Sequence, residues 1–167
     1  KKFEKLSIAG GIRYDARSFS GDALYRSVDV LTGYGKFAGT SSSSGQDTLV
    51  FKKMNRSFSG TTYSVGAAYV FSRKLAIKVN LARGYRAPNI VEISANGVHP
   101  GTYLYQLGNE YFKPEFSLQE DIGLEFISQH LSVNASVFNN DISNYIFNRK
   151  LIGSGGHDSF MQGNPVY

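Results

Sequence analysis

The chain has 167 residues, a formal net charge of +5 and no cysteine, and only 19% of its residues are charged. The lack of cysteine excludes a disulfide scaffold and a thiolate metal site, and no run of about eighteen apolar residues exists that could form a transmembrane helix. Its 12 Phe, 11 Tyr and 18 Gly are typical of β structure. The basic residues are dispersed along the chain, so the positive charge does not indicate a nucleic-acid partner.

Apolar and polar residues alternate with a period of two in five stretches, which is the pattern of a strand with one apolar face. These stretches cover residues 5–16, 58–71, 75–86, 117–127 and 131–147. In the third, the odd-numbered residues from Leu75 to Leu81 are apolar, while the even-numbered ones are small or polar. After Asn140 the pattern blurs, which predicts a bulge or a strand end near Asp141.

Short and long connections alternate between the predicted strands. Residues 72–74 and 128–130 read as tight polar turns, whereas 17–57, 87–116 and 148–164 are long and rich in Gly, Ser and Asn. Such long loops are uncommon in a compact soluble domain, but outer-membrane barrels combine short periplasmic turns with long extracellular loops. The stretch from Leu75 to Tyr85, at roughly 3.3 Å per residue and a tilt of about 40°, spans roughly 25 Å, the height of the apolar band of such barrels.

The pattern therefore predicts an all-β fold, an antiparallel up-and-down meander that forms a segment of a transmembrane β-barrel. It would contain five strands and the start of a sixth. Tyr69 and Phe71 at the short-turn end, with Tyr14 and Tyr85 at the long-loop end, are expected to form two aromatic girdles. An antiparallel sandwich around a soluble core would show the same alternation, so the pattern alone leaves it as an alternative.

Five short strings follow one another between and along the later strands. They read ARGYRAPN (82–89), ANGVHPGTY (95–103), LGNEYFKPE (107–115), IGLEF (122–126) and VFNNDISNYIF (137–147). In their order and spacing they resemble the C-terminal half of the TonB-dependent outer-membrane receptors. The resemblance covers roughly residues 58–167 and is strongest over 79–147.

This resemblance implies a plugged barrel of many strands in the bacterial outer membrane, for which a 22-stranded design is general. It implies energised uptake of a scarce nutrient, such as a ferric siderophore or another metal-linked ligand, with a TonB-type energy-coupling protein and the lipid bilayer as partners. No enzymatic activity, cofactor or nucleic acid is expected. A passive outer-membrane barrel or adhesin is the alternative, followed by a soluble β-sandwich ligand-binding module.

Five strands alone cannot close a barrel, and an open sheet leaves unpaired backbone groups at its edges. Residues 1–167 are therefore expected to be a partial β-barrel domain of a longer receptor, without its plug domain and remaining strands.

A second set of predictions concerns the family strings around the second long loop. Pro88 lacks a backbone donor and is expected to end the strand after Arg86, while Pro114 prepares the next strand at Glu115. Arg86 falls on the lumen face, where we expect it to pair with a carboxylate of the wall or the plug. Gly97, Gly101 and Gly108 are expected to permit tight turns. The residues predicted to be structural are Arg86, Pro88, Asn89, Gly108, Asn109, Pro114 and Glu115.

His99 is the candidate with the sharpest chemistry. It lies in a polar loop with Glu92 and Glu110 nearby in sequence, and imidazole with carboxylates suits Zn²⁺ or Cu²⁺. The loop that contains His99 has no second histidine to support this metal site. A structural or surface histidine is therefore the alternative.

Aromatic residues of the long loops are the other candidates. Ligand contacts are predicted for His99, Tyr103, Tyr105 and Tyr111, joined by Phe112 and by Tyr25, Tyr34 and Phe37 of the first loop. Aromatic faces beside dispersed basic residues suit an anionic chelate. Packing of the loops against each other would use the same residues, so it is the alternative.

Overall fold

The computed structural model describes residues 5–28, 35–42, 47–99 and 101–167. The chain divides into two compact units. One, called here the sheet unit, comprises residues 1–16, 59–87 and 114–145. The other, called here the loop unit, comprises residues 17–58, 88–113 and 146–167. Within the described residues, every helix is too short or too polar to cross a membrane.

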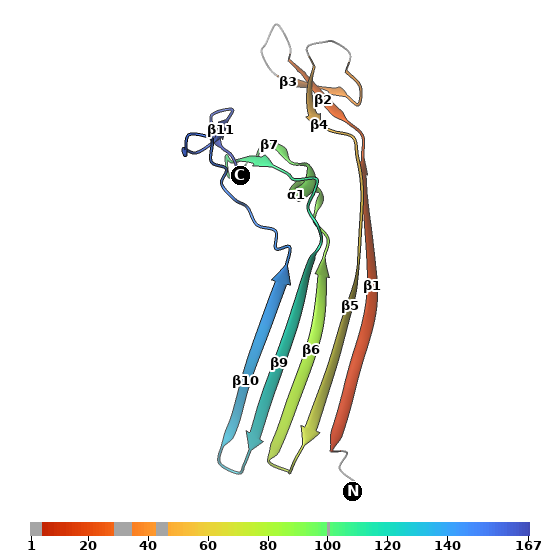
Figure 1. Cartoon of the computed structure of the whole chain (residues 1–167), viewed down its shortest axis with the longest axis vertical. Coiled ribbons are helices and arrows are strands. Elements are labelled where there is room, and N and C mark those ends of the chain that lie inside the picture. Colours follow the sequence, from red (N-terminus) through yellow and green to blue (C-terminus); the bar gives the residue numbers. More distant parts are fainter. Residues whose placement is uncertain (1–4, 29–34, 43–46, 100) are drawn as a thin grey trace. The chain divides into compact units, whose positions relative to one another are not determined.

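The sheet unit is built on five long strands (Figure 1). They are β1 (Leu6–Gly21), β5 (Met54–Val70), β6 (Leu75–Arg86), β9 (Glu115–Ile127) and β10 (Ser132–Ser143). Within this set of five, each strand pairs with the one that follows it in the sequence, which gives the order β1-β5-β6-β9-β10. The sheet is an antiparallel meander, which confirms the predicted fold class.

The strand register places apolar residues in shared rows on one face of this sheet. Val79 of β6 pairs with Ile122 of β9, and Ile122 pairs in turn with Val137 of β10. These three side chains are 43%, 57% and 77% exposed. A contiguous apolar surface of this kind is unfavourable in water, so the face requires an apolar cover.

The opposite face of the sheet is polar and pairs its own charges across strands. Lys78 donates from Nζ to Glu125 at 2.7 Å, and Asn80 donates from Nδ2 to Asp121 at 3.1 Å. Both contacts join β6 to β9, so they reinforce the pairing of these two strands.

Of the bulge or strand end predicted near Asp141, strand β10 shows a strand end at Ser143 and no bulge. Its pairing with β9 is unbroken from Ser132 to Ser143, after which Asn144 takes a left-handed φ of 56°. The pattern blurs for another reason. Phe138 pairs with Asp121 on the polar face, so the alternation of apolar and polar residues reverses in the last part of the strand.

The two aromatic girdles were predicted from spacing alone. At the short-turn end, the rings of Tyr69 and Phe71 meet edge to face with centroids 4.7 Å apart. At the other end, Tyr85 packs against Phe116 of β9 at 5.5 Å. Tyr14 is exposed on β1.

The loop unit contains regular structure that the sequence analysis did not predict. A three-stranded sheet has the order β3-β2-β4, from β2 (Leu24–Val28), β3 (Gly35–Gly39) and β4 (Thr48–Phe51). Helix α1 (Ile90–Ser94) is followed by a hairpin of β7 (Asn96–Val98) and β8 (Tyr105–Leu107). A second hairpin joins β11 (Phe160–Met161) to β12 (Asn164–Pro165). The first long loop begins later and ends earlier than predicted, because β1 continues to Gly21 and β5 starts at Met54. The third begins earlier than predicted, because β10 ends at Ser143.

The described part of the loop unit has a small core of its own. Ile93 of α1, Tyr105 of β8 and Val166 are 3%, 7% and 2% exposed. The C-terminal segment joins this core through its backbone. Tyr167 donates its N–H to the Tyr105 carbonyl at 2.9 Å, and Leu107 donates to the Tyr167 carbonyl at 2.8 Å. Segments far apart in the sequence are thus tied together inside this unit.

Candidate functional site

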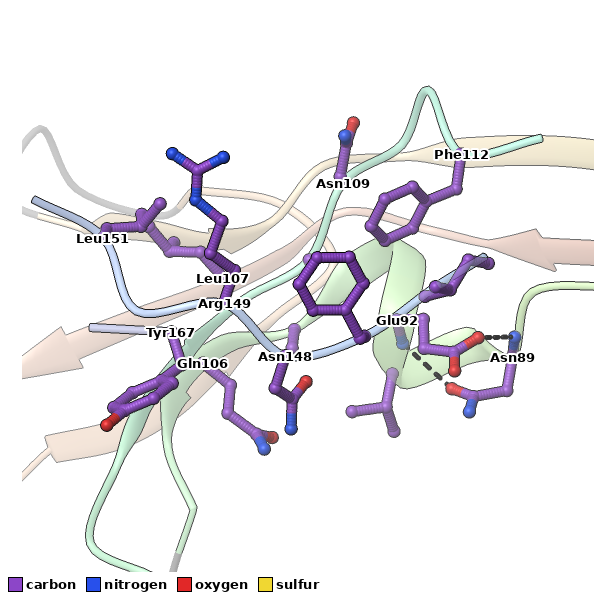
Figure 2. A pocket seen from close by; sticks show the side chains of 15 residues that line it. Asn89, Glu92, Gln106, Leu107, Asn109, Phe112, Asn148, Arg149, Leu151 and Tyr167 are labelled. Carbon is purple, nitrogen blue, oxygen red and sulfur yellow. Dashed lines mark hydrogen bonds between the residues drawn. The ribbon is translucent and has the colours of Figure 1, made fainter. Parts of the chain in front are cut away.

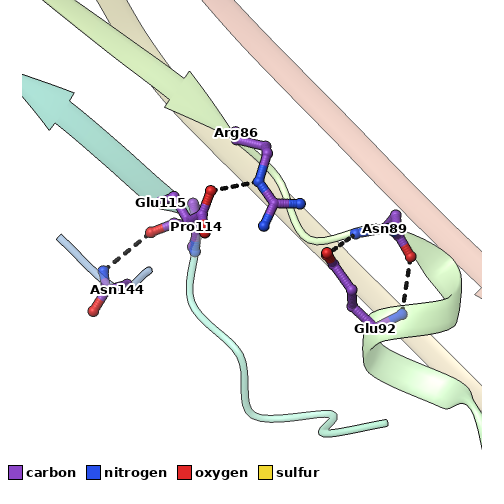
Figure 3. A network of polar contacts seen from close by, with 6 residues as sticks. All are labelled: Arg86, Asn89, Glu92, Pro114, Glu115 and Asn144. Atoms are coloured by element: carbon purple, nitrogen blue, oxygen red, sulfur yellow. Dashed lines mark hydrogen bonds and ion pairs between the residues drawn. The ribbon is translucent and has the colours of Figure 1, made fainter. Parts of the chain in front are cut away.

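Arg86 and Glu115, two of the residues predicted to be structural, lie at the strand ends that the second long loop connects. Strand β6 ends at Arg86 and β9 begins at Glu115, as the two prolines predicted. Arg86 and Glu115 are register partners, and the Arg86 Nε forms an ion pair with the Glu115 carboxylate (Figure 3). Glu115 is 8% exposed, and a buried carboxylate is tolerable only when it is paired. Asn144 adds a hydrogen bond from Nδ2 to the Pro114 carbonyl at 3.0 Å.

Asn89 and Glu92 have a specific local task at the start of α1. The Glu92 N–H donates to Asn89 Oδ1 at 2.9 Å, and the Asn89 N–H donates to the Glu92 carboxylate at 2.8 Å (Figure 3). This reciprocal pair is a capping box. The sequence carried its signal, since Asn followed by Glu three residues later marks a helix start, but the signal was missed. The Glu92 carboxylate is thereby engaged in holding the helix.

Gly108 is required for close packing rather than for a turn. A Cβ at this position would lie 2.6 Å from the backbone nitrogens of Ser94 and Ala95 at the end of α1. The Gly108 N–H donates to the Ala95 carbonyl at 2.7 Å, and the Asn109 N–H donates to the Glu92 carbonyl at 2.8 Å. The chain leaving β8 therefore lies directly on the helix.

Of the three glycines expected to permit tight turns, Gly101 lies in a turn, whereas Gly97 lies inside strand β7. None of Gly97, Gly101 and Gly108 has a positive φ angle. The left-handed residue in the connection between β7 and β8 is Tyr103, with φ 53°. Its N–H donates to the His99 carbonyl at 2.9 Å and closes the turn.

The predicted aromatic contacts fall into different environments. Tyr105 is buried and donates its hydroxyl to Asn96 Oδ1 at 2.8 Å, so it supports the loop core instead of offering a ligand surface, which corrects its prediction. Tyr103 and Tyr111 are 71% and 76% exposed. Tyr34 lies outside the described residues, as does the side chain of Phe37.

The structure does not bring the predicted metal ligands together. Over the ranges it describes, no group of three or more His, Cys, Asp or Glu side chains could hold a metal ion. His99 accepts the Gly101 N–H at Nδ1, at 3.2 Å. Glu92 serves the capping box, and His99, Glu92 and Glu110 line different cavities. Within the described residues, the structure therefore provides no set of three ligands for the metal site that the sequence suggested.

The largest cavity described in the loop unit, called here the apolar cavity, has a volume of about 680 Å³. It is formed by the residues before and after the β3-β2-β4 sheet, by α1 and by the hairpin of β7 and β8. Most of its wall is apolar, and three ionisable side chains also line it. The lining includes Leu24, Phe51, Met54, Ile90, Val91 and Val98, with Asp22, Lys52 and His99. Of the predicted contacts whose side chains the structure describes, only His99 lines it.

A second cavity, called here the amide cavity, has a volume of about 400 Å³ (Figure 2). Aliphatic, aromatic and carboxamide side chains share its wall, which also holds one carboxylate and one guanidinium. The lining includes Asn89, Gln106, Asn109, Phe112, Phe147, Asn148, Arg149 and Tyr167. Sequence reasoning missed Phe147, Asn148, Arg149 and Tyr167, because contacts between segments distant in the chain bring them beside the second loop. The backbone bonds of Tyr105 and Leu107 with Tyr167 are among these contacts.

Comparison with known proteins adds two findings. The sequence model of the family described as TonB dependent receptor-like, beta-barrel matches residues 2–164. A ferric enterobactin receptor of Pseudomonas aeruginosa is 26% identical over 92 residues. The matched segment covers 50% of this chain and 12% of that receptor, so the chain corresponds to a small part of its relative. No solved structure matches.

Proposed function

The chain belongs to the TonB-dependent receptor β-barrel family, and on that basis we propose that it forms part of the wall and loops of an outer-membrane transporter. Residues 1–167 would be a partial barrel domain of a longer receptor that also contains a plug domain and further strands. The observation that carries the proposal is the sheet unit. One face presents exposed apolar rows such as Val79, Ile122 and Val137, while the other pairs its own charges.

In this proposal the two faces of the sheet meet different media. The apolar rows contact lipid, since lipid replaces the water that such a surface disfavours. The polar face lines the lumen, where Lys78 with Glu125 and Arg86 with Glu115 keep the wall rigid. A TonB-type protein would supply energy through the plug domain of the same receptor.

The transported nutrient would be a ferric siderophore or another metal-linked ligand, bound first by the loop unit. The matched relative is named as a ferric enterobactin receptor, which supports this class of ligand. The loop unit offers the apolar cavity, with His99 on its wall, the amide cavity, and two exposed tyrosines, Tyr103 and Tyr111.

Uptake by cells tests this proposal. A strain lacking the gene, and the same strain carrying it on a plasmid, would be compared for accumulation of radioactive iron from a set of ferric chelates under iron limitation. The comparison would be repeated without the TonB protein. The proposal expects accumulation of at least one chelate that needs both the receptor and TonB. Accumulation that needs the receptor but not TonB would indicate a passive barrel, and no receptor-dependent accumulation of any chelate would contradict uptake of metal-linked nutrients.

A further inference from the structure

The wall of the apolar cavity holds one carboxylate and one ammonium group, and the carboxylate is paired with a lysine that does not line the cavity. Asp22 is the acidic residue of the wall, and the adjacent Lys53 pairs with it at 3.3 Å. Lys52 also lines the cavity, and it forms no ion pair or hydrogen bond with any residue that the structure describes. The wall therefore offers one ammonium group without a counter-charge.

His99 adds a second donor to the same wall. Its Nδ1 accepts the Gly101 N–H, so in the neutral ring the proton resides on Nε2. That N–H is a hydrogen-bond donor, and on protonation the ring becomes a cation. In both charge states His99 presents a donor to a ligand and no free acceptor.

The apolar part of the wall indicates that the ligand also has an apolar body. Leu24, Phe51 and Met54 form one part of it, and Ile90 and Val98 form another. Burial of hydrocarbon against such a wall is favourable by roughly 25 cal/mol per Å². A pocket that is mostly apolar with a few polar groups orients a ligand by its polar end and binds it through its apolar body.

The charge of the whole loop unit favours the same sign of ligand. Its residues include nine Lys or Arg and six Asp or Glu, which gives a net charge of +3. A net positive charge raises the local concentration of anions and speeds their association.

We propose that the apolar cavity binds a small organic anion with an aromatic or aliphatic body, whose acidic group accepts from Lys52 and His99. An anionic metal chelate belongs to this class. The inference rests on the proposed function, because it assigns the nutrient's chemistry and its place of first contact.

Three probes that share one ring system separate charge from hydrophobic contact. The probes are 2-naphthoate, 2-naphthylmethanol and 2-naphthylmethylammonium, which are anionic, neutral and cationic. Titration calorimetry would measure their binding to the receptor that contains this chain, reconstituted in lipid nanodiscs. We expect 2-naphthoate to bind at least about tenfold more tightly than the neutral probe, because a charge-assisted hydrogen bond is stronger than a neutral one.

Variants locate the binding. Lys52→Gln should bring the affinity for 2-naphthoate close to that for the neutral probe, whereas Lys113→Gln makes the same charge change in the loop unit away from the cavity wall and should leave it unchanged. Ala23→Trp places a large ring at a wall position in the connection between β1 and β2, and it should weaken binding of all three probes.

Equal affinity for the anionic and neutral probes would overturn the proposal, as would binding that survives Lys52→Gln or Ala23→Trp, or no binding of any probe. These outcomes are separate from the uptake test, since calorimetry requires neither TonB nor transport. If naphthoate binds as expected while no TonB-dependent accumulation occurs, the proposed function fails and the anion site stands.

Discussion

Gly108 offers a sharp test of how the second long loop is held together. Gly108→Ala adds a methyl group 2.6 Å from two backbone nitrogens, those of Ser94 and Ala95, and neither atom can rotate away as a side chain can. The chain leaving β8 must then separate from α1. Overpacking of this kind costs about 1–3 kcal/mol.

The loss should appear in local hydrogen exchange of the reconstituted receptor. The reporters are the N–H groups of Gly108 and Asn109, which donate to the carbonyls of Ala95 and Glu92 at the helix. A loss of about 1–3 kcal/mol in local stability corresponds to a roughly 5- to 150-fold decrease in protection. In the Ala variant, residue 108 keeps its amide, so both reporters can be followed.

Gly97→Ala is the matched control, since a Cβ there would have nothing within 4 Å. It lies in the same loop, so it should leave the protection of both reporters unchanged. If Gly108→Ala and Gly97→Ala have the same effect, the close contact between β8 and α1 is not what the structure indicates. A loss of protection that extends through β6 and β9 would also refute the reasoning, because it would mean that the substitution perturbs the wall and not the loop alone.

Three further predictions concern the wall and the C-terminal segment. Ile122→Lys, on the apolar face, should destabilise the lipid-embedded receptor by about 2–4 kcal/mol in urea titrations, whereas Ser136→Lys on the polar face should change little; equal effects would contradict a lipid-facing surface. Arg86→Met should leave its buried carboxylate partner without this ion pair and cost about 1–3 kcal/mol, measured as faster hydrogen exchange at the adjoining ends of β6 and β9; unchanged exchange would contradict a structural role for the pair. The hydrogen bond to Asp158, at 2.5 Å, raises the pKa of Lys150 above its usual 10.5. The folded state therefore gains stability from this pair below pH 10.5 and loses it as the pH rises through the raised pKa, so Lys150→Met should abolish that part of the alkaline destabilisation.

The long strands of the sheet could be predicted from the sequence. Alternation with a period of two is a property of neighbouring residues, so it can be recognised in the sequence without knowledge of the fold. The alternation predicted β6 with its observed bounds, and it assigned Val79 and Lys78 to opposite faces of the sheet. Pro88 and Pro114 marked the strand ends for an equally local reason, since proline restricts its own φ and the residue before it.

The interior of the loop unit could not be predicted in the same way. Nothing in the neighbours of Tyr105 distinguishes it from Tyr103 and Tyr111, yet Tyr105, which forms a β-bridge with Val166, is buried while the other two are exposed. Phe138 likewise breaks its strand pattern for a reason that only the register with β9 makes visible.

The sequence by itself determined the five long strands and their two faces, because alternation depends on residues close together in the chain. It also indicated the family, through the order and spacing of short strings along the later strands. The tertiary structure alone decided the cavities. It placed Lys52 after β4 and His99 after β7 on one apolar wall, and it placed Glu92 and Glu110, the carboxylates that the sequence suggested as partners of His99, on the walls of other cavities. Which side chains share a wall depends on contacts between segments distant in the chain, and no local pattern encodes those contacts.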